Sequence, residues 1–192
     1  MASQNRPPLI PLETLFGNPE KTSPQISPDG TKISYLAPRD GVLNIWVRTL
    51  QGGDDKPVTQ DKGRGIRSYF WAQDGRHLMY VQDREGDENW HLYSLDLGTG
   101  EIKNYTPFDG VQTRIVGVDK HYPNEILISL NKEDKKLHDV YRLDLSTSKL
   151  ELSAKNPGDI SGWIVDTHFK VRGAVRTRPD GGNDLLIRED ET

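Results

Sequence analysis

The sequence predicts an all-β fold: a β-propeller of four-stranded antiparallel blades, a partial propeller with about four blades present and the last one incomplete. Three observations predict it. Three similar segments carry an aromatic residue in the same place, at Trp46, Tyr93 and Tyr141, which lie 47 and 48 residues apart. A second repeated element, a tight-turn signal followed by an apolar run, precedes each segment at a matching spacing. Each repeat also holds four short strand patterns, and four strands in roughly 40–50 residues are typical of a propeller blade.

The first predicted element is an N-terminal arm at residues 1–22, with a short helical turn at Leu12–Phe16. The blades follow at about residues 23–62, 63–110, 111–158 and 159–192. The predicted strands of the first blade are 25–27, 32–37, 44–50 and 57–59. Those of the second are 67–71, 77–81, 91–97 and 102–105, and those of the third are 113–118, 125–130, 139–145 and 150–152. Asp-Gly pairs mark the turns between first and second strands, because these residues accept left-handed backbone conformations.

The fourth blade is expected to be incomplete. Its predicted strands are 163–165, 170–176 and 183–188, and a fourth strand should follow where the sequence ends at Thr192. Either residues 9–11 supply that strand, or the chain is part of a longer propeller. We favour the longer propeller, because residues 189–192 resemble a hairpin loop before its return strand. Unpaired blade faces would then be exposed, and we expect self-association through them.

One sheet cannot bury both of its faces alone, so each blade must pack against its neighbours, and we expect the repeated aromatic residues to lie between them. We expect these layers to be filled by Tyr35, Trp46, Tyr80, Tyr93 and Tyr141.

Composition is that of an ordinary globular protein. The 192 residues carry a net charge of −4, 33% are hydrophobic and 28% are charged. No basic block is present to neutralise phosphates, so nucleic acid is not expected as a partner. Because no apolar run is long enough for a membrane span or a signal peptide, we expect a cytoplasmic protein without a membrane partner. The absence of cysteine excludes disulfides, thiol nucleophiles and thiolate metal sites.

Two blade signatures carry a family resemblance. The segments are Ser27-Pro28-Asp29-Gly30-Thr31-Lys32-Ile33-Ser34-Tyr35 and Trp71-x-x-Asp74-Gly75-Arg76-x-Leu78-x-Tyr80. They resemble TolB-type propellers and, equally, the N-terminal propellers of the prolyl oligopeptidase family of serine peptidases. The stretch from Asp83 through Gly86-Asp87-Glu88-Asn89 to Thr99-Gly100-Glu101 is more similar to acylaminoacyl-peptidase-like members, as is the segment at 171–182. The resemblance runs from about residue 12 to the end.

This resemblance implies a propeller that caps an α/β-hydrolase domain. The hydrolase would hold a Ser-Asp-His triad, with its serine in a Gly-x-Ser-x-Gly turn, and the propeller would screen out large folded substrates. Dipeptidyl peptidases of the family also place paired glutamates in the propeller to hold the ammonium group of the substrate. The nearest segment here, Asp87-Glu88-Asn89-Trp90, has these residue types in a different order, so that role is not carried over.

No catalytic residue is predicted in this chain. Ser161 is flanked by Asp159 and Trp163 where the glycines of the hydrolase turn should be, and Ser68, Ser94 and Ser129 also lack them. After about 180 residues of strand repeats there is also no room for an α/β-hydrolase domain.

No cofactor-binding or metal-binding residue is predicted either. Four carboxylates, Asp83, Glu85, Asp87 and Glu88, could wrap a calcium ion, but a solvated hairpin tip is favoured. Zinc-type spacing is absent from the five histidines, His77, His91, His121, His138 and His168. The glycines around Arg64 are taken as a loop between blades, not a phosphate site, and residues 132–136 as another solvated hairpin tip.

The sequence therefore indicates a non-catalytic propeller segment of a prolyl-oligopeptidase-family serine peptidase. It would gate or orient peptide substrates for a hydrolase domain that lies outside this chain. The alternative is a stand-alone TolB-like propeller that binds a protein partner and hydrolyses nothing.

Overall fold

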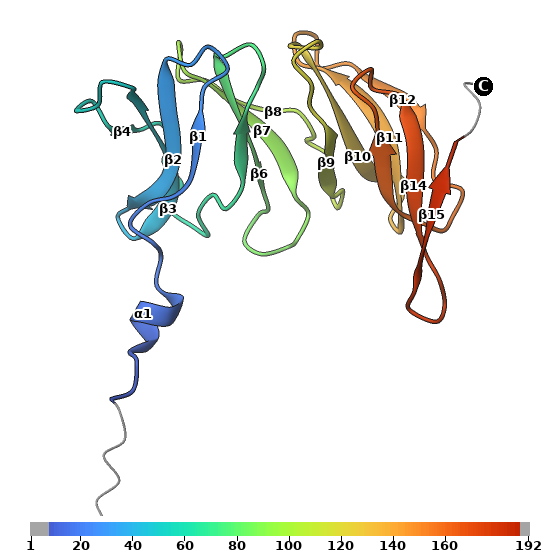
Figure 1. The fold of residues 1–192 in the computed structure, drawn as a ribbon, viewed down its shortest axis with the longest axis horizontal. Helices are drawn as coiled ribbons and strands as arrows, with labels where there is room; N and C mark the ends of the chain where they lie inside the picture. Colours follow the sequence, from blue (N-terminus) through green and yellow to red (C-terminus); the bar gives the residue numbers. More distant parts are fainter. Residues whose placement is uncertain (1–7, 189–192) are drawn as a thin grey trace, which may run out of the picture.

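Four antiparallel sheets stand one after another along the chain in an open arc (Figure 1). The computed structural model describes residues 8–188. It begins with the short helix α1 (Leu12–Phe16), and every sheet then takes its strands in sequence order, each strand paired with the next. This is the up-and-down arrangement of a propeller blade, so the predicted fold class is confirmed. The first and last sheets lie at opposite ends of the arc, and the ring is not closed (Figure 1).

The strands fall close to the predicted positions. The first sheet contains β1 (Thr22–Ile26), β2 (Lys32–Arg39), β3 (Val42–Thr49) and β4 (Lys56–Pro57). The second contains β5 (Tyr69–Trp71), β6 (His77–Gln82), β7 (His91–Asp96) and β8 (Ile102–Asn104). The third contains β9 (Thr113–Gly117), β10 (Glu125–Asp134), β11 (Leu137–Asp144) and β12 (Leu150–Ala154). The fourth contains β13 (Ile160–Val165), β14 (Val171–Thr177) and β15 (Asn183–Ile187).

The fourth sheet has three strands within residues 8–188, in the order β13-β14-β15. Residues 9–11 do not add a fourth, because they form no strand and the side chain of Leu9 is 95% exposed. The hairpin loop predicted at 189–192 lies outside the described residues. The outer edge of β15 is therefore unpaired in the part of the chain that the structure describes.

Aspartates fix the turns at one end of the blades. Gly30 and Gly75 have φ values of 70° and 68°, in the left-handed region that glycine tolerates. The Asp29 and Asp74 carboxylates before them accept the backbone N–H two residues further on, at 3.0 and 2.9 Å. Asp96 caps the turn between β7 and β8 in a similar way, accepting the N–H of Gly98 at 2.7 Å.

The core lies between adjacent sheets, in three clusters. The first cluster joins the first two sheets through Leu36, Ile45, Leu78 and Tyr80. The second joins the next pair through residues that include Met79, Leu92, Ile126, Ile128 and Tyr141. The third joins the last pair through Leu127, Val140, Phe169 and Val171. Alternate residues of β6 and of β10 thus face opposite neighbours, as the two-residue period of a strand requires.

The prediction for the inter-blade aromatics is confirmed for Tyr80 and Tyr141, whereas the interfaces between the four described sheets do not test it for Tyr35 and Trp46. Tyr80 and Tyr141 are buried between sheets, and Tyr93 packs partly against the first cluster. Tyr35 and Trp46, however, belong to none of these clusters and stack on each other with ring centres 6.5 Å apart. Because Leu36 faces the second sheet, the neighbouring Tyr35 points to the outer face of the first sheet, where no preceding blade is described. Trp46 stacks on the Tyr35 ring, the Lys21 ammonium lies over it, and the Tyr35 hydroxyl donates to Asp55.

Within residues 8–188, no helix combines the length and apolar character needed to cross a lipid bilayer.

Candidate functional site

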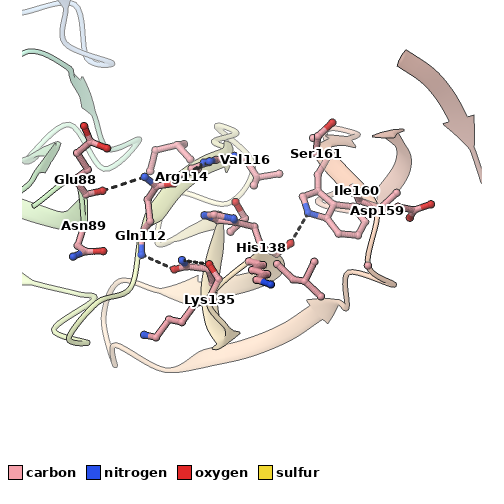
Figure 2. A pocket seen from close by; sticks show the side chains of 18 of the residues that line it. Glu88, Asn89, Gln112, Arg114, Val116, Lys135, His138, Asp159, Ile160 and Ser161 are labelled. Atoms are coloured by element: carbon pink, nitrogen blue, oxygen red, sulfur yellow. Dashed lines mark hydrogen bonds between the residues drawn. The ribbon is translucent and has the colours of Figure 1, made fainter. Parts of the chain in front are cut away.

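A polar pocket opens between the second, third and fourth sheets, at the blade end where β9 begins and the β10–β11 hairpin turns (Figure 2). Its volume is about 850 Å³. The side chains that matter for its chemistry are those of Glu88, Gln112, Arg114, His138, Ser161 and Trp163. They come from the β6–β7 loop, from the start of β9, from β11 and from β13. Three blades are therefore needed to form one site.

Gln112 holds the Arg114 guanidinium in place at the pocket. The Gln112 Oε1 atom accepts hydrogen bonds from Arg114 Nε and Nη2, at 3.1 and 2.9 Å. Gln112 is itself fixed, because its backbone N–H donates to Asn131 Oδ1 at 2.6 Å and its side-chain amide donates to the Glu88 carbonyl oxygen at 3.1 Å. No carboxylate within residues 8–188 forms an ion pair with Arg114, so its positive charge is available to a ligand.

His138 presents an unsatisfied ring nitrogen to the same pocket. Its Nε2 atom is buried and has no hydrogen-bond partner among the described residues. Burial lowers the pKa of His138 to about 4, with a further lowering from the Arg114 charge and an opposing contribution from Asp139. The imidazole is therefore neutral at pH 7. Its backbone carbonyl accepts the indole N–H of Trp163 at 3.0 Å, which fixes one wall of the pocket.

The acidic loop at one side of the pocket differs from the prediction of a solvated tip. The Asp83 side chain is 2% exposed and accepts a hydrogen bond at 2.6 Å from Nη1 of the partly exposed Arg64, so this carboxylate is buried in an ion pair. Its Oδ2 atom also accepts the backbone N–H of Glu88 at 3.3 Å. Glu85, Asp87 and Glu88 are exposed, as predicted. Arg64 therefore ties the loop between blades to the acidic loop.

Glu88 adopts a left-handed backbone conformation, with φ of 58°, which is uncommon for a residue with a side chain. Such conformations persist where the surrounding structure holds them and are frequent at ligand sites. Here the bond from the Glu88 N–H to Asp83 and the bond from Gln112 to the Glu88 carbonyl provide that hold.

None of the serines singled out by the sequence has a catalytic neighbourhood. Ser161 Oγ donates to the Val175 carbonyl at 3.1 Å and accepts from Thr177 Oγ1 at 3.0 Å. Ser94 and Ser129 are buried in strands, whereas Ser68 is exposed in a loop. Ser161 has no histidine hydrogen-bond partner in the described part of the chain.

The remaining histidines serve the blades separately. His91 is buried and bonds through Nδ1 to the Thr106 carbonyl at 2.5 Å. His121 pairs with Asp119 at 2.6 Å, and His168 is exposed in a turn. Across residues 8–188, no three His, Asp or Glu side chains are grouped so that they could hold a metal ion.

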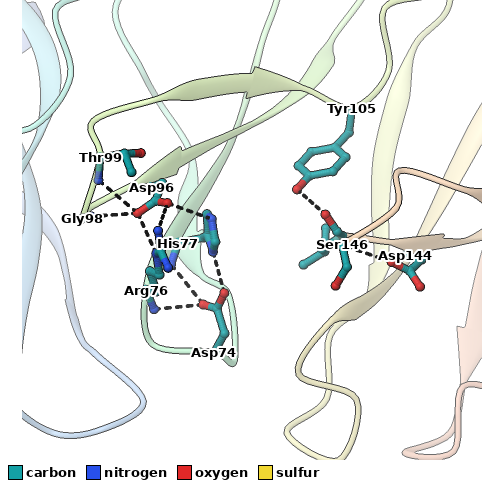
Figure 3. A network of polar contacts seen from close by, with 10 residues as sticks. Asp74, Arg76, His77, Asp96, Gly98, Thr99, Tyr105, Asp144 and Ser146 are labelled. Atoms are coloured by element: carbon teal, nitrogen blue, oxygen red, sulfur yellow. Dashed lines mark hydrogen bonds and ion pairs between the residues drawn. The ribbon is translucent and has the colours of Figure 1, made fainter.

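A second polar network lies at the opposite end of the second blade (Figure 3). His77 Nδ1 is 2.5 Å from Asp74 Oδ2, and its Nε2 is 3.8 Å from Asp96 Oδ2. Arg76 Nε donates to Asp96 Oδ1 at 2.8 Å. These contacts join the turn before β6 to the turn after β7, so we assign the network to blade structure.

The sequence did not reveal Gln112, Arg114, His138 and Trp163 as a group. Gln112, Arg114 and His138 belong to the third blade and Trp163 to the fourth, and each by itself resembles an ordinary strand residue. One feature of the sequence marks Arg114 as a repeated position: Arg67 lies 47 residues before it, at the matching place in the preceding blade. Ile66 and Thr113 each donate a backbone N–H to the preceding hairpin, to Leu43 at 2.9 Å and to Trp90 at 2.8 Å.

No protein-family model matches the chain. The sequence is 44% identical over 181 residues to dipeptidyl aminopeptidase BIII of Pseudoxanthomonas mexicana, which covers 94% of this chain and 26% of that protein. The chain thus spans about a quarter of the length of this relative.

Among solved structures, the chain is similar to acylaminoacyl peptidase of Pyrococcus horikoshii, with a TM-score of 0.55 and 20% identity over 90% of this chain and 31% of that one. It is also similar to TolB of Acinetobacter baumannii, with a TM-score of 0.57 and 20% identity over 88% of this chain and 40% of that one. At this identity the two likenesses speak for the propeller fold alone.

Proposed function

We propose that this chain, a propeller portion of the prolyl oligopeptidase family, receives peptide substrate and orients it toward a hydrolase domain outside the chain. The observation that carries the proposal is the 44% identity to dipeptidyl aminopeptidase BIII, which extends over 94% of the chain. The likeness to TolB does not distinguish a peptidase propeller from a stand-alone propeller that binds a protein partner, because structures of both kinds match the fold equally well.

The pocket supports a role in peptide reception. Its volume of about 850 Å³ lies within the range of roughly 300–1,000 Å³ common for ligand sites. Its lining offers unsatisfied groups of three kinds: the Arg114 cation, the neutral His138 nitrogen and the exposed Glu88 carboxylate. A peptide presents carbonyls, N–H groups and charged termini, and can therefore satisfy all three.

The chemistry of cleavage is assigned to another domain. A serine nucleophile needs a base within hydrogen-bond reach, and Ser161 bonds to Val175 and Thr177 instead. The contribution of this chain is then to hold the peptide in one orientation, which lowers the entropic part of the barrier to reaction.

The test is a chimera in which this chain replaces its 181-residue match in dipeptidyl aminopeptidase BIII of P. mexicana. We expect the chimera to hydrolyse peptide substrate. Within it, Ser161→Trp should narrow the pocket and lower kcat/KM. The control Ser153→Trp lies on exposed β12 outside this pocket and should leave kcat/KM unchanged. If the chimera is folded and active and Ser161→Trp leaves its kcat/KM unchanged, peptide reception at the pocket is contradicted. That result would favour a propeller that binds a protein partner.

A further inference from the structure

We infer that the pocket recognises a carboxylate group of the peptide, bound by the free edge of the Arg114 guanidinium with His138 Nε2 beside it. This inference rests on the proposed function and adds the chemical group that the pocket selects. The carboxylate can come from a peptide C-terminus or from an acidic side chain, and the experiment below separates these sources.

The free edge follows from the way Gln112 holds the arginine. A guanidinium carries five N–H donors in a planar fork. Gln112 Oε1 occupies the edge formed by Nε and Nη2. The other edge, formed by Nη1 and Nη2, has no partner among residues 8–188. This edge matches the two oxygens of a carboxylate, which arginine binds through two parallel hydrogen bonds.

The orientation of Gln112 is fixed by its neighbours. Its amide nitrogen donates to the Glu88 carbonyl at 3.1 Å, so the oxygen must point the other way, toward Arg114. Its backbone N–H is held by Asn131. The guanidinium therefore meets a ligand in a preset orientation, and little side-chain entropy is lost on binding.

His138 adds a second donor without adding charge. A neutral imidazole can carry its proton on Nε2, and the buried Nε2 atom lacks a partner in the described chain. A buried polar atom without a hydrogen bond is unfavourable, so a ligand oxygen that accepts from it gains affinity. The Trp163 ring stays fixed, because its N–H is already bonded to the His138 carbonyl.

The charges around the pocket favour a single negative charge over a phosphate dianion. The lining contains Arg114, Lys135 and Lys136 against Asp87, Glu88 and Asp159. Lys135 is already bonded to the carbonyls of Asp109 and Gly110, at 3.1 and 2.9 Å. The Arg114 fork matches the two oxygens and the single charge of one carboxylate, whereas the lining carboxylates oppose the second charge of a dianion more strongly.

The experiment measures binding of dansyl-labelled peptides to the 192-residue chain by fluorescence anisotropy at pH 7. One pair is dansyl-Ala-Ala-Ala-Ala with a free C-terminus and the same peptide as its amide. A second pair is dansyl-Ala-Asp-Ala-Ala-amide and its Asn counterpart. We expect a peptide with a carboxylate to bind about tenfold more tightly than its neutral partner, as charge-assisted hydrogen bonds predict. The first pair reports on C-termini and the second on acidic side chains.

Arg114→Gln should abolish this difference. Arg67→Gln is the matched control, because Arg67 occupies the same position one blade earlier, is exposed and does not line the pocket. Arg114→Lys keeps the charge but loses the fork, so it should weaken the carboxylate preference severalfold. Circular dichroism verifies that each variant is folded. If Arg114→Gln does not fold, the Arg114→Lys result decides.

Equal binding of acids and amides would overturn the carboxylate inference and leave peptide reception standing. If none of the four peptides binds, the carboxylate inference is also overturned. The proposed function is tested separately, by whether the chimera hydrolyses peptide substrate. A preference that survives Arg114→Gln would place the carboxylate elsewhere and refute the assignment to Arg114.

Discussion

Trp71 of the second blade donates its indole N–H to the hydroxyl oxygen of Ser34 in the first blade, at 2.8 Å. Both side chains are buried, Ser34 fully and Trp71 with 3% exposed. The bond therefore joins two blades inside the core that they share. A buried indole N–H needs a partner, and a serine on the facing strand supplies it.

Ser34→Ala should lower the free energy of unfolding by about 2 kcal/mol, because the buried Trp71 N–H loses its acceptor. Urea denaturation measures the change. Ser153→Ala is the control, since Ser153 is exposed on β12, and it should shift stability by less than about 0.5 kcal/mol. Equal stability of the two variants would show that the Ser34–Trp71 bond does not hold the blades together.

Stability should depend on His138 between pH 7 and pH 4. The pKa of His138 is lowered to about 4, mainly by burial and then by Arg114, with Asp139 opposing. In the unfolded chain the pKa is near its ordinary value of 6.5. As the pH falls below 6.5, the unfolded state therefore binds a proton before the folded state does. The free energy of unfolding decreases as the pH falls from about 6.5 to about 4. We expect the loss to be about 1–3 kcal/mol, allowing for the partial exposure of the ring.

The His138→Gln variant should lose less stability than the unmodified chain between pH 7 and pH 4.5, measured by urea denaturation at each pH. His168→Gln, an exposed control, should follow the unmodified chain. Parallel pH curves for all three proteins would contradict a neutral, buried His138.

The outer face of the fourth sheet should mediate self-association. Ile164, Leu185 and Ile187 are 42%, 63% and 72% exposed, and strand register places them on one face with Gly173 and Val175. Ile187→Lys should reduce the molar mass measured by light scattering. Leu15→Lys, on the exposed helix α1, should leave it unchanged. A monomeric unmodified chain would contradict this expectation.

A fluorophosphonate probe should not label the chain, because no serine among the described residues has a histidine base. Ser161, whose hydroxyl bonds to Val175 and Thr177, is the residue to monitor by mass spectrometry. A serine peptidase treated in parallel provides the positive control. Labelling at any serine would place catalytic chemistry inside this propeller portion.

The repeat predicted the blades well, because strand patterns and turn residues are local. The strand expected at 91–97 is β7 (His91–Asp96), and the Asp-Gly turns lie where glycine can adopt a positive φ. The predicted strand at 125–130 is too short, because the apolar pattern ends there and charged residues follow. In the structure, β10 (Glu125–Asp134) extends beyond residue 130 into this charged hairpin tip. The hairpin continues there after the apolar pattern has ended, with a register shift between Leu130 and Asp134 before Asp134 pairs with Leu137.

The pocket could not be predicted, because its contacts join distant parts of the chain. Asp83 reads as a surface carboxylate, yet Arg64 from the preceding connection buries it. In the sequence, Arg114 resembles any exposed strand residue. Only the structure shows that Gln112 Oε1 accepts from the Nε and Nη2 edge of its guanidinium and leaves the Nη1 and Nη2 edge free within residues 8–188. Such a site arises from the packing of three blades, which no single repeat encodes.

Peptide reception at the pocket is tested most directly by hydrogen–deuterium exchange of the chain, with and without saturating acetyl-Ala-Ala-Ala-Ala. We expect slower exchange at residues 112–116, 129–138 and 158–163, which surround the pocket, and no such protection in the Arg114→Gln variant. Unchanged exchange there, or protection confined to the open face at β15, would contradict peptide reception at this end of the propeller.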